Sequence, residues 1–242
     1  MKIEIWSDFV CPFCYIGKRK LEEALSGFPD KDQVEIEFKS FQLDPNASLY
    51  TGQDFYESMA IKFGSVEQAK QMTAAITEQA KLVGLDFRFD TMKPTNTYDA
   101  HRLTKFATEQ GKGAVLSEKL LYANFTESKD VGNIEVLAEI AEAAGLEKEA
   151  ALAVLQNTQA YEKEVHTDIA EARQFGITGV PFFILNRKYA ISGAQPTETF
   201  VQALDKVWKE EKSTPTFESL VSNTGTDAAC ADGSCAISEQ NK

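Results

Sequence analysis

The cysteine pair in Cys11-Pro12-Phe13-Cys14 constrains this chain more than any other feature. It follows an apolar segment, residues 3–6, that has the character of a strand, and a stretch with helical spacing begins at about Pro12. Two cysteines three residues apart on a helical turn lie within about 5–6 Å, so a disulfide between them can open and close with little backbone movement. A pair at such a strand-to-helix junction indicates redox chemistry.

The two cysteines are expected to have different roles. Pro12 suits the first helical position, because the amide hydrogen that proline lacks would have no partner there. Cys11 then lies where free amides and the positive end of the helix dipole favour an anion, so we expect its thiol to ionise more readily than free cysteine and to attack. Cys14, one turn further in, is expected to be more shielded and to resolve the mixed disulfide.

The composition indicates a globular chain whose main partners are neither nucleic acids nor membranes. Of its 242 residues, 43% are hydrophobic, which is enough to bury a core. A net charge of −12 argues against phosphate-rich partners, which need a clustered basic surface. No apolar run approaches the length of a membrane span, and the first residues lack a secretory pattern, so we expect a cytoplasmic location. Cysteines in that reducing compartment are seldom structural.

Hydrophobic spacing divides the chain into a strand–helix–strand opening, a helical middle and a strand–strand–helix end. Residues 33–41 alternate like a second strand, and the short helical connection favours parallel pairing with the first strand. Seven helical runs follow between about Pro45 and Gly176, and most are followed by glycine, a frequent helix-ending residue. Residues 180–185 and 189–192 predict an antiparallel hairpin, and a last helix begins near Pro196.

These segments predict a mixed α/β fold in which an all-helical domain interrupts a small sheet domain. We expect the sheet domain to comprise residues 1–45 and 177–212, and the inserted helical domain to comprise residues 46–176. Residues 213–242 are rich in Ser, Thr, Ala, Gly and Asp and lack sustained apolar spacing. They are expected to form a flexible tail.

Two distant motifs together resemble the DsbA-type thioredoxin-fold family, and within it the FrnE-like cytoplasmic branch. They are Asp8-Phe9 with Cys11-Pro12-Phe13-Cys14, and Gly176-Ile177-Thr178-Gly179-Val180-Pro181-Phe182-Phe183 with Gly193-Ala194-Gln195. The resemblance covers essentially the whole chain and implies a thioredoxin fold with a cis proline, Pro181, facing the cysteines. Phe13 stands where DsbA-type oxidants carry a basic histidine, so we expect a weaker oxidant than the periplasmic enzymes.

Four further residues are candidates for the cleft around the cysteines: Pro12, Phe13, Val180 and His101. Backbone groups beside Val180 and Pro181 would form a strand edge that pairs with an extended client segment, although a trans proline that begins a strand is the alternative from sequence alone. His101 lies in a segment similar to one on the family's insertion and could shuttle protons, with a buried structural role as the alternative. His166, among acidic residues, is expected on a solvated helix face.

Aromatic residues near the cysteines suggest an apolar rim that attracts unfolded clients. Phe9, Phe13 and Tyr15 are assigned to this rim. Core packing is the expectation for Trp6, Phe182 and Phe183.

Cys230 and Cys235 form a second pair in the tail. The intervening Asp232-Gly233 favours a turn that brings the two sulfurs together, and the chain from Lys212 to Cys230 spans roughly 20–25 Å. Following the FrnE-like resemblance, we expect this pair to exchange disulfides with Cys11 and Cys14. Inert thiols and a zinc site built from all four cysteines are the alternatives.

The function expected from these observations is thiol–disulfide exchange with client proteins that carry cysteines. No resident cofactor or metal is expected beyond the redox-active disulfide, and the recycling partner is not identified, with glutathione or a thioredoxin-type reductant as candidates. The superfamily that the chain resembles also contains glutathione-dependent isomerases of small aromatic carboxylates, such as 2-hydroxychromene-2-carboxylate isomerase. Those enzymes generally use serine where Cys11 stands, so two cysteines favour exchange. A zinc-binding module that uses four cysteine ligands is the third alternative.

Overall fold

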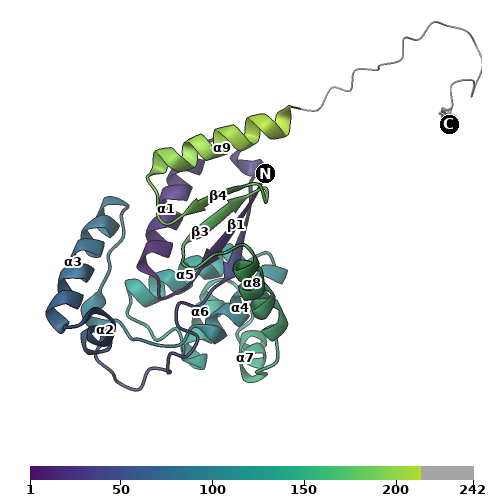
Figure 1. The fold of residues 1–242 in the computed structure, drawn as a ribbon. Helices are drawn as coiled ribbons and strands as arrows, with labels where there is room; N and C mark the ends of the chain where they lie inside the picture. The colour runs from purple at the N-terminus through teal and green to yellow at the C-terminus, as the bar shows by residue number, and fades with distance from the viewer. Residues whose placement is uncertain (214–242) are drawn as a thin grey trace, which may run out of the picture.

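The computed structural model describes residues 1–213 and contains a four-stranded mixed sheet with the order β2-β1-β3-β4 (Figure 1). The strands are β1 (Lys2–Ser7), β2 (Glu35–Ser40), β3 (Phe182–Leu185) and β4 (Tyr189–Ser192). β1 pairs with β2 in parallel and with β3 in antiparallel, and β3 and β4 form an antiparallel hairpin. The predicted parallel opening and closing hairpin are confirmed, and they share one sheet.

Nine α-helices occur in the described residues, and seven of them, α2 to α8, lie between β2 and β3 in the sequence. They are α1 (Pro12–Ser26), α2 (Phe55–Phe63), α3 (Val66–Leu82), α4 (Tyr98–Glu109), α5 (Gly113–Phe125), α6 (Ile134–Ala143), α7 (Lys148–Gln156), α8 (Glu162–Gln174) and α9 (Thr197–Lys212). No helix within residues 1–213 combines the length and the apolar character that crossing a bilayer requires. The helices α2 to α8 confirm the seven helical runs predicted for the middle of the chain.

Alternation along β1 directs side chains into two different cores. Ile3 and Ile5 pack on the face covered by α1 and α9, which lie side by side (Figure 1). Trp6 points to the opposite face, where it packs with Ala172 of α8 and donates its indole hydrogen to the Asp168 carbonyl at 3.0 Å. The sheet is thus covered on both faces, as the period-two pattern of a buried strand requires.

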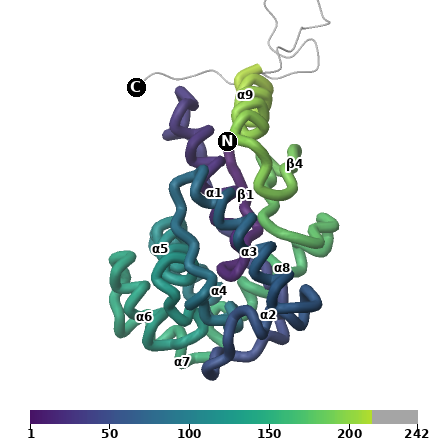
Figure 2. The backbone as a smooth tube through the Cα atoms, turned by 90° about the vertical axis from the view of Figure 1, so that its left-hand side faces the viewer, coloured from purple at the N-terminus to yellow at the C-terminus, as the bar shows by residue number. Residues whose placement is uncertain are grey.

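The helical block has a core of its own that reaches the cysteine loop. Phe9, Tyr15 and Ile16 pack into the same cluster as buried side chains of α3 to α7. This block lies at the end of the molecule away from α9 (Figure 2). The start of α1 is therefore held between the sheet and the inserted helices.

Local signals account for most helix ends. The Ser65 hydroxyl accepts the Gln68 amide hydrogen at 3.2 Å and so caps the start of α3. Gly84 (φ 75°) and Gly176 (φ 68°) adopt the left-handed conformation that ends a helix at little cost. Two short 3₁₀ helices, Lys31–Gln33 and Phe89–Thr91, were not predicted. The first of them delays the start of β2 to Glu35.

A buried ionic cluster attaches two inserted helices to the sheet. The Asp168 carboxylate of α8 accepts the Ser40 amide hydrogen of β2 at 2.7 Å and forms ion pairs with Lys105 of α4 and with Lys39 of β2. Asp168 is 2% exposed, so these partners compensate the cost of removing its charge from water.

Candidate active site

Cys11 and Cys14 lie on the first turn of α1, both as free thiols. Cys11 is the residue that precedes the helix, with an extended backbone (φ −92°, ψ 110°), and Pro12 occupies the first helical position. The Cys11 amide donates to the Asp8 carbonyl and the Cys14 amide to the Cys11 carbonyl, both at 3.1 Å. The Cys11 sulfur therefore lies at the start of the helix, where backbone amides are unpaired.

The segment Val180–Pro181 lies directly against Cys11. The Val180–Pro181 peptide bond is cis, and the Cys11 thiol donates to the Val180 carbonyl at 3.4 Å. Gly17 permits this approach, because a β-carbon there would lie 3.1 Å from Cγ of Pro181 and 3.2 Å from a ring atom of Phe183. Two motifs about 170 residues apart in the sequence thus form one site.

The two thiols differ in their hydrogen bonds more than in their exposure. Cys11 is 4% and Cys14 3% exposed. Burial, together with a hydrogen bond to Cys11, raises the pKa of Cys14 well above its usual value, although the Ser7 side chain and the Asp8 backbone act in the opposite direction. Cys14 therefore remains a neutral thiol in the reduced protein.

Asp8 joins three segments beneath the cysteine loop. Its side chain is buried, and Oδ2 accepts the Leu43 amide hydrogen while Oδ1 accepts the Thr97 hydroxyl, both at 2.8 Å. His101 Nε2 lies 3.5 Å from Oδ1. Sequence reasoning used Asp8 only as part of a motif. An acid directly after a buried strand and before the apolar Phe9 and Val10 was the signal that could have identified it.

His101 lies below the cysteine loop rather than in an open cleft. Its ring is tilted against Phe9, with centroids 4.8 Å apart, and its Nε2 has no hydrogen-bond partner in residues 1–213. The burial of His101 agrees with a structural role. Its Nε2, however, lacks the hydrogen bond that a buried structural histidine normally makes. His166 is exposed on α8, where its Nε2 lies 3.4 Å from the Tyr98 hydroxyl.

Two of the three residues assigned to an exposed aromatic rim around the cysteines were wrongly assigned. Phe9 and Tyr15 are 3% and 0% exposed because they point into the core of the helical block, where Tyr15 stacks on Phe87. Phe13 is half-buried and packs against the same core. Trp6 and Phe183 are buried, as predicted, and Phe182 is half-buried.

An apolar cavity of about 550 Å³ opens beside the cysteine loop instead. Val10 and Pro12, which flank Cys11, form one side, and the opposite side comes from α2, α3 and the segment before α4, including Met59, Ile76 and Phe89. Several of its apolar side chains are unusually exposed: Leu43 (49%), Ile61 (88%) and Met72 (45%). Sequence reasoning missed this surface, because it placed these residues on separate helices without their packing.

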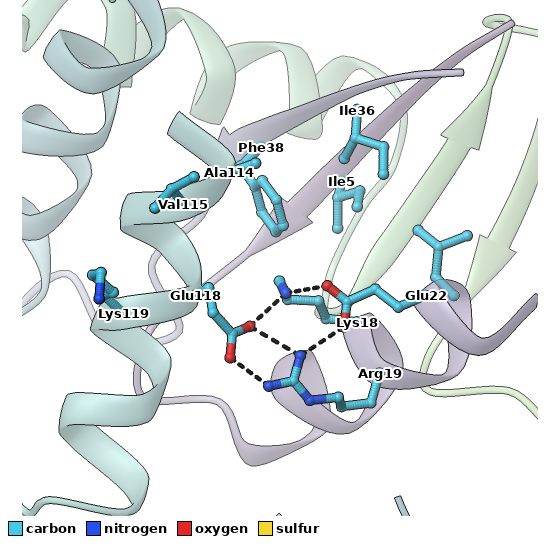
Figure 3. Close-up of a pocket in the computed structure, with 11 residues that line it drawn as sticks. Ile5, Lys18, Arg19, Glu22, Ile36, Phe38, Ala114, Val115, Glu118 and Lys119 are labelled. Atoms are coloured by element: carbon cyan, nitrogen blue, oxygen red, sulfur yellow. Dashed lines mark hydrogen bonds and ion pairs between the residues drawn. The ribbon is translucent and has the colours of Figure 1, made fainter. Parts of the chain in front are cut away.

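A second cavity, of about 540 Å³, lies between α1, β2 and α5 (Figure 3). Glu118 of α5 forms ion pairs with Lys18 and Arg19 of α1, and both cations also pair with Glu22. These central charges neutralise one another, and their ion pairs hold α1 against α5. The cavity therefore presents no evident reactive group.

Cys230 and Cys235 lie outside the described residues. Within residues 1–213, no three His, Cys, Asp or Glu side chains are gathered so as to hold a metal ion.

The order of the sheet, the Cys-x-x-Cys pair at the first helix and the proline segment opposite it define a protein of the thioredoxin-fold class. The DSBA-like thioredoxin domain matches residues 2–205, and the chain belongs to this family. A probable DsbA oxidoreductase from Streptomyces coelicolor is 40% identical, with a TM-score of 0.83 over 99% of this chain and 100% of that chain. The uncharacterized protein YwbO of Bacillus subtilis is 29% identical over 211 residues, 86% of this chain and 98% of YwbO.

More distant structures share the fold alone. The cytosolic disulfide reductase DsbM from Pseudomonas aeruginosa, solved with GSH, has a TM-score of 0.58 and 14% identity over 86% of this chain and 100% of DsbM. A 2-hydroxychromene-2-carboxylate isomerase has a TM-score of 0.62 and 16% identity over 87% of this chain and 98% of the isomerase.

Proposed function

We propose that this protein is a thiol–disulfide oxidoreductase that exchanges disulfides with protein thiols through Cys11 and Cys14. The observation that carries the proposal is the position of two free thiols on the first turn of α1, with the Cys11 sulfur 3.4 Å from the Val180 carbonyl. Membership of the DSBA-like family and the oxidoreductase names of two similar structures support it. The name of the cytosolic reductase also supports a cytoplasmic location.

The reducing direction begins when the Cys11 thiolate attacks one sulfur of a client disulfide. A Cys11–client disulfide forms and the other client sulfur leaves as a thiolate. Cys14 then loses its proton and attacks the Cys11 sulfur, which closes the Cys11–Cys14 disulfide and releases the second client thiolate. Two electrons pass from the pair to the client, and the two thiol protons pass to solvent or to the leaving thiolates. The oxidising direction is the reverse.

The raised pKa of Cys14 suits this order of events. Part of the rise comes from the hydrogen bond with Cys11 and from the charge on Cys11. Both are removed when Cys11 enters the mixed disulfide, so Cys14 becomes easier to ionise when its attack is needed. The geometry therefore favours sequential use of the two thiols.

Client recognition is assigned to two surfaces beside Cys11. The backbone at Val180 and Pro181 offers an edge for an extended segment, and Pro12 and Phe13 form the other side. The adjoining apolar cavity suits a hydrophobic client side chain more than an anionic small molecule. Its cation Lys62 is already paired with Asp44 at 3.2 Å.

Reduction of insulin by the purified protein tests the proposal. We expect wild-type protein to precipitate the insulin B chain with dithiothreitol as the electron source, and Cys11→Ser to lose this activity. Cys14→Ser should instead accumulate a mixed disulfide that dithiothreitol releases, because the resolving thiol is absent. Equal, slow rates for wild type and Cys11→Ser would refute the exchange activity.

A second candidate function is isomerisation of a small aromatic carboxylate with glutathione. The fold shared with an isomerase favours it, whereas the two retained cysteines and a cavity whose cation Lys62 is already paired do not. Glutathione-dependent isomerisation of 2-hydroxychromene-2-carboxylate, followed by absorbance and undiminished in Cys14→Ser, would favour this function over exchange.

A further inference from the structure

Asp8 and His101 form a buried pair that has no role in the exchange steps proposed for the cysteines. The two residues are 1% and 2% exposed, and His101 Nε2 lies 3.5 Å from Asp8 Oδ1. Among residues 1–213 this nitrogen has no hydrogen-bond partner. Desolvation disfavours a charged imidazole and a facing carboxylate favours it, so the charge state of one residue of the pair depends on that of the other.

The Asp8 carboxylate needs a positive partner if it is ionised. Its other contacts, the Thr97 hydroxyl and the Leu43 amide, are neutral donors, and a buried charge without a counter-charge is costly. Within the described part of the chain, His101 is the basic residue paired with Asp8.

The neighbouring charged groups are engaged elsewhere. They lie on α4, which carries His101, and on the segment between β2 and α2, and their ion pairs are Arg102–Asp99, Lys105–Asp168 and Asp44–Lys62. The titratable residue nearest to Asp8 along the chain is Cys11, at the start of α1.

Residue 8 also contacts both cysteines through its backbone. Its carbonyl oxygen accepts the Cys11 amide hydrogen at 3.1 Å, and its backbone hydrogen bond to the Cys14 sulfur favours the thiolate form. Asp8 lies three residues before Cys11, and the His101 ring packs on Phe9, two residues before Cys11, with centroids 4.8 Å apart. The pair therefore lies beneath the loop that carries Cys11, in a desolvated setting where water screens charges little.

We propose that His101 is a positioning residue of the exchange reaction which, as an imidazolium paired with Asp8, balances the carboxylate and stabilises a thiolate on Cys11. This inference rests on the proposed role of Cys11 as the attacking thiol. In wild type the imidazolium favours the thiolate and the carboxylate opposes it. Without His101 the carboxylate acts alone, whereas without Asp8 the imidazolium loses its counter-charge and both charges are removed. The thiolate favours the imidazolium by the same amount, since such coupling is reciprocal.

The pH dependence of Cys11 alkylation tests this proposal. Reduced full-length protein is treated with iodoacetamide across a pH series, and tandem mass spectrometry follows modification at Cys11. His101→Gln removes the cation and leaves the carboxylate, so it should raise the midpoint of the profile by about one pH unit or more. Asp8→Asn removes the counter-charge that holds the proton on His101, so both charges are lost and the midpoint should stay near that of wild type. The double variant should lie near wild type.

His166→Gln is the matched control, because the second histidine of the chain is exposed on α8 and should leave the profile unchanged. A shift in Asp8→Asn as large as that in His101→Gln, or a shift in His101→Gln no larger than that of the control, overturns the proposal. A purely structural role would lower the melting temperature of both variants without confining the shift in the profile to His101→Gln.

A second measurement needs no variant at the pair. With only two histidines, nuclear magnetic resonance resolves their imidazoles in the wild-type chain, and His101 should retain its proton to higher pH in the reduced than in the oxidised protein. Equal titration in the two states overturns the proposal. Insulin reduction by the same sample tests the proposed function separately, because neither alkylation nor imidazole titration requires turnover.

Discussion

Hydrogen bonding, rather than exposure, distinguishes the two cysteines at the level of single residues. Both are almost completely buried, yet Cys11 donates to the Val180 carbonyl whereas Cys14 is surrounded by Cys11, Ser7 and the Asp8 backbone. The exposed fractions of Cys11 and Cys14 are nearly equal, so they do not confirm the prediction that Cys14 is the more shielded residue. The expected order of attack and resolution stays a prediction, supported by the raised pKa of Cys14.

The raised pKa of Cys14 predicts a specific dependence of stability on pH. The folded, reduced protein keeps a proton on Cys14 that the unfolded chain releases above about pH 8.5, so the free energy of unfolding falls there by up to about 1.4 kcal/mol per pH unit. Urea unfolding of reduced protein between about pH 7 and pH 10 should show a steeper fall for wild type than for Cys14→Ala. Parallel curves would contradict the raised pKa.

Residue-level errors of the sequence analysis have a common physical origin. Tyr15 and Phe9 flank a reactive motif and for that reason were expected at the surface, but the inserted helices cover that side of α1. Gly17 was not recognised as a close-approach position, because its neighbour Pro181 is distant in the sequence. Periodicity within one helix reveals the buried face but not the partner that buries it.

At the level of secondary structure, α1 is held to α5 by a charged cluster. The Glu118 carboxylate accepts the Tyr15 hydroxyl at 2.6 Å and pairs with Lys18 and Arg19 (Figure 3). Burial alone would raise the pKa of Glu118, but these hydrogen bonds lower it overall. This cluster orients the helix that carries both cysteines.

Glu118→Gln should therefore destabilise the protein in a pH-dependent way. Since the pKa of Glu118 is lowered by folding, its stabilisation is present above the unfolded value of about 4.3 and is lost as the pH falls through the folded value. We expect the variant to lose about 1–3 kcal/mol of unfolding free energy at about pH 7 and much less near about pH 3. Chemical denaturation at both pH values measures this, with exposed Glu139→Gln as the control. A loss that does not depend on pH would argue against the ion pairs.

The apolar surface of α3 leads to a prediction about client binding. Met72 lines the cavity beside Cys11, whereas Leu82 on the same helix is 87% exposed and lies outside it. Met72→Glu should lower kcat/KM for insulin by about tenfold, because a client side chain loses an apolar contact. The rate with oxidised glutathione should stay unchanged. Leu82→Glu should behave like wild type with both substrates, and an equal loss in both variants would exclude a specific role of the cavity.

Most helices and strands could be predicted because their signals are local. Asp54 and Ser65 cap α2 and α3, and glycines end several helices. The 3₁₀ turns escaped prediction because three residues are too short to show a hydrophobic period.

At the level of the whole molecule, the site is built from segments that only the tertiary fold brings together. Asp8 binds Leu43 and Thr97, and Cys11 contacts Val180. The Cys-x-x-Cys pattern at a strand-to-helix junction identified the cysteines from sequence, and the resemblance to a known family added Pro181. The cavity and the Asp8–His101 contact depend on how the inserted helices pack on the cysteine loop, and no local pattern encodes that packing.

The tail pair gives a prediction that concerns the full chain. If Cys230 and Cys235 relay electrons to Cys11 and Cys14, replacing both with Ser should slow multiple turnover, because a tethered pair acts at an effective concentration of the order of millimolar. Insulin reduction with several reductants measures this. A single turnover of prereduced Cys11 and Cys14 should be unaffected and serves as the control. Unchanged turnover with every client and reductant would exclude the relay.

The antiparallel pairing of β1 with β3 also has a consequence for protein synthesis. The cysteines are synthesised more than 160 residues before Pro181. At translation rates of about 5–20 residues per second, the thiols wait roughly 10–30 s before their opposing strand exists. During that interval the nascent chain carries a dithiol without its finished cleft, and it depends on the surrounding redox buffer to keep the pair from reacting prematurely.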